Sequence, residues 1–256
     1  MEFTGKVAIS TGAASGMGLL FAENFASLGG NVVMCDVNEE VLAEKVAAIN
    51  EKKGGRAIGV RCDVRNYSEV CAVRDKAVEA FGRIDVLVNF AGGTAVRIKG
   101  VKRAEYPEFP DVPIDVYDFG IDLNLKGPFY FAHAVTKQMR EQKSGLIINI
   151  GSITGAEGDG YGMDYPTSKA GLMYGLTKTI AQFGAPHGIR CVCVSPGPVL
   201  TRAAMANMLT MLGRAAEPQE IIDLCLFIAS DKGQFINGEN IMIDGGRNAM
   251  LRMTKS

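Results

Sequence analysis

Residues 6–18 read KVAISTGAASGMG, and this stretch decides the fold class. Lys6–Ser10 is a short apolar run that predicts a buried strand, and the segment that follows the stretch, LLFAENFASLGG, has the length and pattern of a helix. Between them, Gly12, Gly16 and Gly18 form a turn in which the backbone can approach a pyrophosphate closely. The N–H groups and dipole at the start of the helix attract the same anion. This order of elements predicts a dinucleotide-binding unit.

The next predicted strand, NVVMCD, ends at Asp36. A carboxylate at the end of the second strand can accept hydrogen bonds from both hydroxyls of an adenosine ribose, and it repels a 2′-phosphate. Ser15, just before the second glycine, supplies no positive charge for such a phosphate. The alternative, that Asp36 caps the helix after it, is compatible with this role. The pattern therefore predicts NAD rather than NADP as the cofactor.

Strands and helices continue to alternate along the chain. RAIGVRCDV predicts a third strand ending at Asp63, a helix follows, and RIDVLVNFAGG predicts a fourth strand ending at Asn89. Regular alternation predicts an α/β fold, a doubly wound parallel sheet with helices on both faces, whose strands end at one common edge. No repeat or low-complexity linker appears, so we expect a single domain over residues 1–256. Residues 1–93 would mainly hold the cofactor, and residues 117–256 would carry catalysis and substrate binding.

Composition narrows the class of partner. The 27 basic and 28 acidic residues nearly cancel, so no net field favours nucleic acid or an anionic membrane. Mean hydropathy is +0.11, and no apolar run approaches the ~20 residues of a membrane helix. The opening sequence MEFTGKVAIS lacks the regions of a signal peptide, so a cytoplasmic location is expected.

Six cysteines are spread through apolar patterns. Cys191 and Cys193 are close in the sequence, but no second pair of ligands lies at the spacing of a zinc site. We therefore predict no metal site and no disulfide. The expected buried free thiols are Cys35, Cys62, Cys71, Cys191, Cys193 and Cys225.

A second stretch, NIGSITGAEGDGYGMDYPTSK at residues 149–169, carries side chains that can do chemistry. LIINI predicts a buried strand that ends at Gly151 and Ser152, and a helix begins near Tyr165. Tyr165 and Lys169 lie four residues apart and share one face of that helix. The ammonium stabilises a phenolate, so the phenol can exchange a proton near neutral pH, and Ser152 can bind a substrate oxygen beside it. A surface Tyr and Lys is the alternative; the strand-end Ser argues against it.

Residues 94–116 interrupt the regular pattern. Three prolines exclude a helix across the middle, and a basic cluster of Arg97, Lys99, Lys102 and Arg103 precedes several acidic residues. A solvated loop is favoured over a flap that contacts substrate. In the helix that follows, Asn124 predicts a local kink that holds a water. His133 on the same helix is expected in the core or at a subunit interface.

At this point the chain resembles the short-chain dehydrogenase/reductase family over nearly its whole length. The family pattern T-G-x-x-x-G-x-G stands at residues 11–18 and N-x-A-G at residues 89–92, with Phe90 where the family usually has a second Asn. The resemblance implies a Rossmann-type domain with seven parallel strands, usually assembled as a homotetramer. It also implies hydride transfer between a nicotinamide carbon and a carbinol or carbonyl carbon. The family's catalytic residues map onto Asn124, Ser152, Tyr165 and Lys169.

The resemblance assigns a role to each catalytic residue. Tyr165 exchanges the hydroxyl proton, while Lys169 supports the phenolate and holds the nicotinamide ribose. Ser152 orients the substrate oxygen, and Asn124 keeps a water that relays the proton to solvent. The expected cofactor contacts are Gly12, Ser15, Gly16, Met17, Gly18, Asp36, Asp63, Val64, Asn89, Ala91, Gly92, Tyr165, Lys169, Pro196, Gly197, Val199 and Thr201.

In the family, the region after Pro196-Gly197 folds over the substrate. Here this lid segment, residues 198–216, is rich in Met and Leu, which suits a bulky, largely apolar secondary alcohol or ketone. The alternative is that its side chains pack on the core or on a neighbouring subunit. Other open hypotheses are a 3-oxoacyl thioester reductase and a non-catalytic nucleotide-binding protein. A sugar or polyol dehydrogenase is a further alternative, since the loop from Ser152 to Tyr165 has polar side chains that could bind hydroxyls: Glu157, Asp159, Tyr161 and Asp164. The lid side chains in question are Leu200, Met205, Met208, Leu209, Met211 and Leu212.

Overall fold

The computed structural model describes residues 1–98, 100, 105, 107–160 and 162–250, and it contains one seven-stranded sheet. All neighbouring strands pair in parallel, in the order β3-β2-β1-β4-β5-β6-β7, which confirms the predicted fold class and strand number. The strands are β1 Val7–Thr11, β2 Asn31–Asp36, β3 Ala57–Arg61, β4 Val86–Asn89, β5 Gly145–Ile150, β6 Ile189–Pro196 and β7 Asn240–Ile243.

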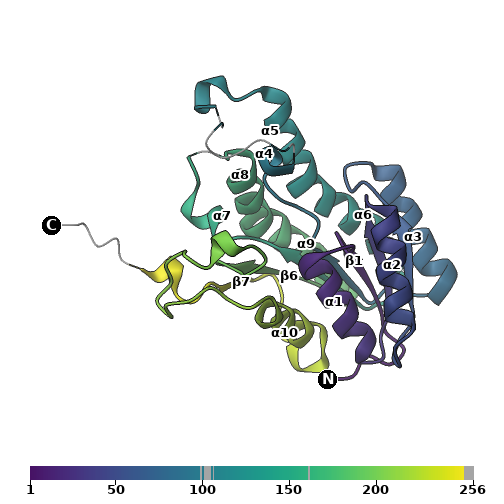
Figure 1. Cartoon of the computed structure of the whole chain (residues 1–256). Coiled ribbons are helices and arrows are strands. Elements are labelled where there is room, and N and C mark those ends of the chain that lie inside the picture. Colours follow the sequence, from purple (N-terminus) through teal and green to yellow (C-terminus); the bar gives the residue numbers. More distant parts are fainter. Residues whose placement is uncertain (99, 101–104, 106, 161, 251–256) are drawn as a thin grey trace.

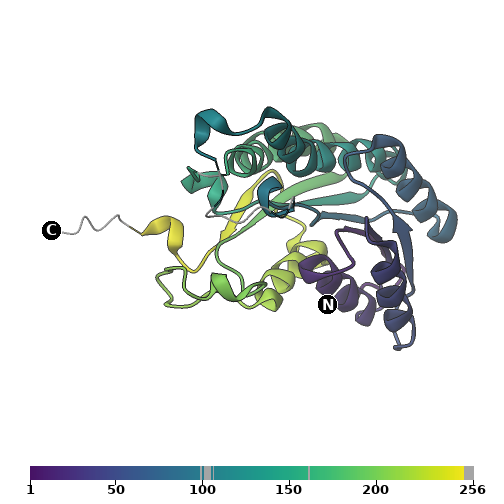
Figure 2. The same ribbon diagram turned by 45° about the horizontal axis from the view of Figure 1, so that its top comes forward.

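Helices cover both faces of the sheet. Helices α1, α2 and α10 pack on one face, and α3, α6 and α9 pack on the other, as Figure 1 and Figure 2 show. The helices are α1 Gly16–Ser27, α2 Glu39–Asn50, α3 Tyr67–Phe81, α4 Ala95–Ile98, α5 Ile114–Ile121, α6 Gly127–Gln142, α7 Thr154–Glu157, α8 Asp164–Ala170, α9 Thr177–Gly184 and α10 Pro218–Ala229.

Strand side chains alternate between the two faces, as the pleat of a strand requires. In β1, Ala8 belongs to the core under α1 and α10, whereas Val7 and Ile9 belong to the core under α3 and α6. Both faces are therefore buried. This is why the strands are continuous apolar runs in the sequence rather than alternating apolar and polar residues.

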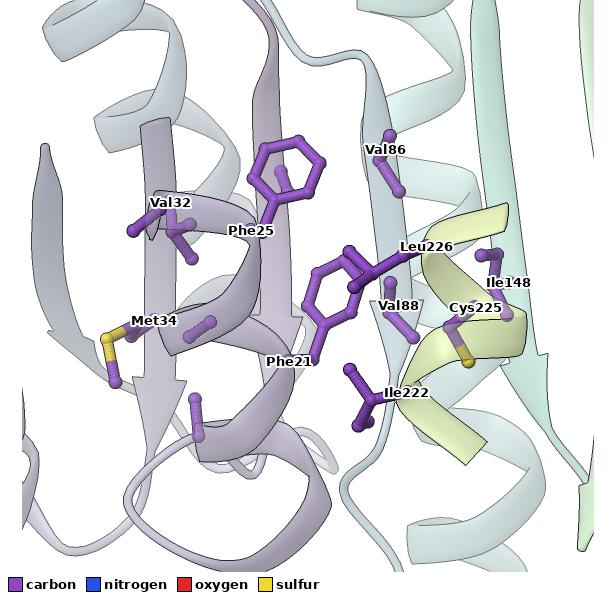
Figure 3. Packing of buried hydrophobic residues seen from close by; sticks show 14 of the residues in the cluster. Phe21, Phe25, Val32, Met34, Val86, Val88, Ile148, Ile222, Cys225 and Leu226 are labelled. Carbon is purple, nitrogen blue, oxygen red and sulfur yellow. The ribbon is translucent and has the colours of Figure 1, made fainter. Parts of the chain in front are cut away.

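Aromatic stacking holds α1 onto the sheet beside α10. The rings of Phe21 and Phe25 lie 5.5 Å apart, and Phe25 stacks on Phe3 at 4.3 Å. Figure 3 shows the ring of Phe21 next to the side chains of Ile222 and Leu226 from α10, and the ring of Phe25 further along α1. Full burial of one such ring stabilises the fold by about 1.5–3 kcal/mol. This packing fixes the start of α1, and with it the glycine turn, against the sheet.

The strand order places a switch point between β1 and β4. The chain moves outward through β2 and β3 and then returns to the other side of β1, so the connections on either side diverge. In open α/β sheets, ligands bind in the crevice that this divergence leaves at the carboxyl ends of the strands. Thr11, Asp36, Asn89 and Ile150 end their strands at that edge.

The kink predicted at Asn124 is present as a π-helical segment, Asp122–Lys126, between α5 and α6. A second π-helical segment, Gly171–Leu176, separates α8 from α9. The sequence does not predict this second segment, because its residues have ordinary helical length and spacing. Both segments lie next to predicted catalytic residues, where π turns are frequent.

Residues 94–116 contain short helical pieces. Helix α4 is not predicted by the sequence. The prolines exclude a long helix here, as predicted, and a short 3-10 turn covers Phe109–Asp111. Helix α5 begins directly after Pro113. Three members of the predicted basic cluster, Lys99, Lys102 and Arg103, lie outside the described residues.

All six cysteines are free thiols, and five of them are buried as predicted. Cys71 on α3 is only half-buried and packs against the core cluster that α3 and α6 cover. His133 is exposed and not in the core; its Nδ1 lies 2.6 Å from the hydroxyl of Tyr67. Within the part of the chain that is described, no helix is long and apolar enough to cross a membrane.

Candidate active site

The glycine turn after β1 has the backbone geometry that its sequence predicts. Gly12 and Gly16 adopt left-handed φ angles of 64° and 58°, which other residues rarely adopt. A Cβ on Gly18 would lie 2.5 Å from the carbonyl oxygen of Gly12, so α1 starts unusually close to the turn. Ser15 is the N-cap of α1 and makes no side-chain capping bond. Met17 lies in the first turn and packs partly on the core.

The turn is fixed to the segment after β4. The backbone N–H of Ala91 donates to Oγ1 of Thr11 at 2.9 Å, and a Cβ on Gly12 would lie 3.0 Å from Cα of Ala91. The two predicted nucleotide segments are therefore held side by side across the switch point. This leaves the first-turn N–H groups of α1 open toward the crevice.

Asp36 lies beside the turn at the end of β2. Its Oδ2 accepts the N–H of Ala14 at 3.1 Å, and its Oδ1 accepts the N–H of Asn38 at 3.0 Å. The alternative role as a helix cap does not hold, because Asn38 is the N-cap of α2 and its side chain accepts from Val41. Each carboxylate oxygen of Asp36 keeps a further acceptor site, as binding of two ribose hydroxyls requires.

Asp63 lies just after β3 and is paired with Arg65. The Arg65 guanidinium binds both carboxylate oxygens, with Nη2 2.6 Å from Oδ2, and it stacks on the ring of Phe119 at 4.3 Å. Arg65 holds the pKa of the Asp63 carboxyl below its usual range. Asp63 is therefore an oriented, ionised acceptor. Its neighbour Val64 is buried against Gly127.

Asn89 starts a chain of buried amide hydrogen bonds. Its Nδ2 donates to Asn149 at 2.9 Å, and Asn149 donates to Oγ1 of Thr177 at 3.0 Å. These bonds join β4, β5 and α9 beneath the site. Phe90, where the family usually has Asn, packs on Phe21 instead at 5.7 Å.

Asn124 is fully buried in the first π-helical segment. Its Oδ1 accepts the N–H of Gly93, and its Nδ2 donates to the carbonyls of Gly93 and Gly120, each at 2.9 Å. Both amide protons are used, so only one acceptor site of Oδ1 remains for a water. The side chain therefore also fixes the segment that follows β4.

Lys169 is a buried ammonium, with 3% of the residue exposed. Its Nζ donates to the carbonyl of Ile150 at 2.6 Å and lies 5.4 Å from the centroid of the Tyr165 ring. Among the described residues, no carboxylate lies within ion-pairing distance of it. An ammonium has three donors, so two remain for the phenol oxygen and for hydroxyls of a ligand.

Gly92 leaves room for a ligand between these groups. A Cβ there would lie 2.7 Å from Oδ1 of Asn124 and 3.5 Å from Nζ of Lys169. Any side chain at Gly92 would therefore enter the space in front of Lys169. The space suits a ribose, whose hydroxyls can accept from the ammonium.

Ser152 follows β5 at the same edge. Its Oγ accepts from the backbone N–H of Thr154 at 3.2 Å and from Oγ1 of Thr154 at 2.8 Å. A hydroxyl that accepts twice still has its own proton to donate. Ser152 is therefore oriented to donate to a carbonyl or alkoxide oxygen, which is the predicted role.

The segment after β6 completes the edge. A Cβ on Gly197 would lie 2.7 Å from Cα of Asp244, and Pro196 accepts the N–H of Ile153 at 2.9 Å. Val199 is buried, and its carbonyl accepts the N–H of Thr201 at 2.7 Å. Val199 and Thr201, two of the predicted cofactor contacts, thus lie at the start of the lid segment, and Pro196 joins this part of the chain to Ile153, next to Ser152.

The lid segment is closed at its base by a pairing of Val199 with Ala216. Arg214 forms an ion pair with Glu220 at 2.6 Å and lowers the pKa of Glu220 to about 2. Met205 and Met208 are half-buried. The other predicted lid side chains do not pack on the core of this chain. These exposed side chains are Leu200, Leu209, Met211 and Leu212.

Two sets of contacts at the site are not predicted from the sequence. Asp164, next to Tyr165, is buried; its Oδ2 accepts the N–H of Ala95 at 3.2 Å, and its Oδ1 has no partner among the described residues. Burial raises the pKa of its carboxyl. The second set is the ion pair between Arg247 and Glu157, 90 residues apart in the sequence.

Known proteins resemble this chain along most of its length. Residues 12–248 match the family model described as enoyl-(acyl carrier protein) reductase. The chain is 40% identical to trans-4-hydroxycyclohexanecarboxylate dehydrogenase of Sinomonas cyclohexanicum, over 95% of this chain and 93% of the relative. It is 34% identical to D-threitol dehydrogenase of Mycolicibacterium smegmatis, over 94% and 92%. A solved short-chain type dehydrogenase/reductase from Mycobacterium ulcerans has the same fold, with a TM-score of 0.88 at 23% identity, covering 97% of this chain and 92% of that chain.

Proposed function

The chain belongs to the short-chain dehydrogenase/reductase family, and on that premise we propose that it is an NAD-dependent dehydrogenase of a bulky, largely apolar secondary alcohol. It is an oxidoreductase that acts on CH–OH groups with NAD(P). The observation that carries the proposal is the position of Lys169. Its Nζ lies beside Asn124 at the space in front of Gly92 and near the ring of Tyr165, and it donates to the carbonyl of Ile150, two residues before Ser152.

The residues present fit a dinucleotide. The first-turn N–H groups of α1 and the open side of Gly16, with no atom within 4 Å of a Cβ there, suit a pyrophosphate. Asp36 would hold the adenosine ribose and Lys169 the nicotinamide ribose. When bound, NAD supplies the carbon that accepts the hydride.

The protein's own residues handle the proton. Ser152 would donate to the substrate oxygen and fix it next to the Tyr165 hydroxyl. Tyr165 would then take the hydroxyl proton during oxidation, or return it during reduction, a contribution of ~100 to 10,000-fold in rate. Lys169, held by the carbonyl of Ile150, would stabilise the phenolate that forms. Asn124 would keep a water at the π-helical segment, from which the proton leaves.

The preference for NAD over NADP rests on Asp36. A 2′-phosphate would meet this carboxylate and would displace two ribose hydrogen bonds. Arg61 lies opposite Asp36 in the β2–β3 pairing, but its guanidinium binds Glu69. This basic side chain is therefore already engaged and does not offset the repulsion.

The substrate class rests on the lid segment. Exposed Leu and Met side chains of the lid segment favour an apolar ligand that the lid covers. The name of the relative from Sinomonas cyclohexanicum, a hydroxycyclohexane carboxylate dehydrogenase, is consistent with a cyclic secondary alcohol. The second relative is named for a polyol, D-threitol, and the family model for an acyl carrier protein thioester; these are the competing substrates.

The test is a screen of alcohols with NAD, followed by absorbance of NADH. It should contain cyclic apolar alcohols, hydroxysteroids, polyols and 3-hydroxyacyl thioesters. We expect turnover of at least one cyclic apolar alcohol with NAD. Oxidation of polyols or thioesters alone would contradict the substrate class, and lack of any turnover would favour a non-catalytic nucleotide-binding role.

A further inference from the structure

Arg247 joins two segments that lie far from it in the sequence. It begins a 3-10 turn, Arg247–Ala249, after β7. Its Nε donates to Oε1 of Glu157 at 2.9 Å, and its Nη2 donates to Oε2 at 3.1 Å. Its Nη1 donates to the carbonyl of Leu209 at 3.0 Å. One guanidinium therefore binds α7 with two donors and the lid segment with a third.

Each of these segments belongs to the site. Glu157 ends α7, and Thr154 at the start of α7 donates to Oγ of Ser152. Leu209 lies in the lid segment that starts after Pro196-Gly197. Arg247 thus links the lid to the loop that orients the substrate oxygen, at a point remote from the glycine turn.

The backbone of Gly245 and Gly246, just before Arg247, contacts the lid. Leu212 donates its N–H to the carbonyl of Gly245 at 3.1 Å. A Cβ on Gly245 would lie 3.1 Å from Cβ of Thr210, and a Cβ on Gly246 would lie 2.9 Å from Sδ of Met211. The lid therefore packs closely against the backbone of Gly245 and Gly246.

The side chain of Asp244 stabilises this part of the backbone. Its Oδ1 accepts the N–H of Gly246 at 3.0 Å, and its Oδ2 accepts the N–H of Asn248 at 2.6 Å. These bonds fix the turn from which the Arg247 side chain extends. The guanidinium is therefore presented by a rigid element, so its attachment determines where the lid lies.

Hydrophobic burial contributes little to the attachment of the lid near Arg247. Leu209, Met211 and Leu212 are 71%, 66% and 70% exposed. Because the hydrophobic contribution scales with the apolar area removed from water, polar contacts must carry most of the attachment. A two-pronged Arg–carboxylate pair is the stronger kind of ionic contact and also sets direction.

We infer that Arg247, through Glu157 and Leu209, is a positioning residue that sets the affinity for substrate. It holds the lid against the Ser152 loop and leaves the nucleotide site unaffected. The inference rests on the proposed function for its kinetic consequence, whereas its structural consequence for the lid can be measured without a substrate.

The structural test compares amide hydrogen exchange in Arg247→Gln, Glu157→Gln and wild type. The matched control is Arg74→Gln, since Arg74 forms an ion pair with Asp75 on α3 and has similar exposure, 27% against 24% for Arg247. We expect both site variants, but not the control, to increase exchange in residues 203–213 by roughly tenfold, the effect of losing one charged hydrogen bond. Unchanged exchange in a folded Arg247→Gln protein would overturn the inference, whatever the enzyme oxidises.

The kinetic test uses the alcohol found in the screen. KM should rise roughly tenfold in Arg247→Gln and Glu157→Gln, while kcat and the Kd for NADH stay within about twofold. Each single charge reversal, Arg247→Glu or Glu157→Arg, should raise KM. The double variant that exchanges the two charges should reverse part of this increase. Equal changes in KM and in the Kd for NADH, or no recovery in the exchanged pair, would show a general structural role instead. If exchange changes but no alcohol is oxidised, the proposed function fails and the lid attachment stands.

Discussion

Asp36 is the residue at which the cofactor preference can be changed. Its carboxylate is held by the N–H groups of Ala14 and Asn38 and keeps acceptor sites for a ribose. In Asp36→Asn, the negative charge is lost, so the Kd for NADPH should fall and the Kd for NADH should rise, each by about tenfold. Titration by nucleotide fluorescence measures both. A wild-type protein that binds NADPH more tightly than NADH would contradict this assignment.

Asp164 is the residue whose ionisation should limit stability. Because burial raises the pKa of its carboxyl, folding takes up a proton, and its contribution to stability is lost as the pH rises through that raised pKa. In Asp164→Asn the side chain stays neutral at every pH. The Tm of the variant minus that of wild type should therefore increase between pH 4.5 and pH 8, measured by circular dichroism. A difference independent of pH would show that the carboxyl is not ionising within the fold.

At the scale of elements, the methionines of the lid segment should act on substrate alone. Met205 and Met208 are half-buried in it, away from the glycine turn. Truncating both to Ala removes flexible apolar surface, so KM for a cyclic alcohol should rise about tenfold while the Kd for NADH is unchanged. Steady-state kinetics and nucleotide titration separate the two. Equal loss of affinity for NADH would mean that these side chains support the cofactor site.

Helix α1 is the element on which the nucleotide site depends for its position. Phe25 is fully buried between Phe3 and Phe21. Phe25→Ala should lower the free energy of unfolding by about 3–5 kcal/mol, measured by urea denaturation. Phe235→Ala, at a fully exposed ring, is the control and should change it by less than ~0.5 kcal/mol. Similar values for the two variants would contradict the packing described for α1.

For the whole molecule, the fold follows from the sequence because local signals agree with each other. Apolar runs of strand length alternate with helical segments, and each strand ends at a Gly, Asp or Asn or within two residues before one. The π-helical segment at Gly171–Leu176 and the short α4 have no such signal. Their backbone depends on contacts with distant parts of the chain rather than on their own residues.

The sequence predicts the position of those candidate site residues that are placed by a single helix or strand. Tyr165 and Lys169 share a helix, and Ser152 lies two residues after the end of β5, so spacing places them. The burial of Asp164 and the attachment of Arg247 depend on long-range packing, which no local pattern reports. Sequence reasoning therefore predicts the position of the candidate residues on their elements better than the contacts that hold them.

The most direct test of the whole account is removal of a single oxygen in Tyr165→Phe. The ring and its contact with Lys169 remain, so the circular dichroism spectrum and the Kd for NADH should match those of wild type. The kcat for the alcohol found in the screen should fall by at least ~100-fold, the contribution of a general acid or base. A variant that keeps near-normal turnover would contradict the account, because the proton would then pass through a different residue.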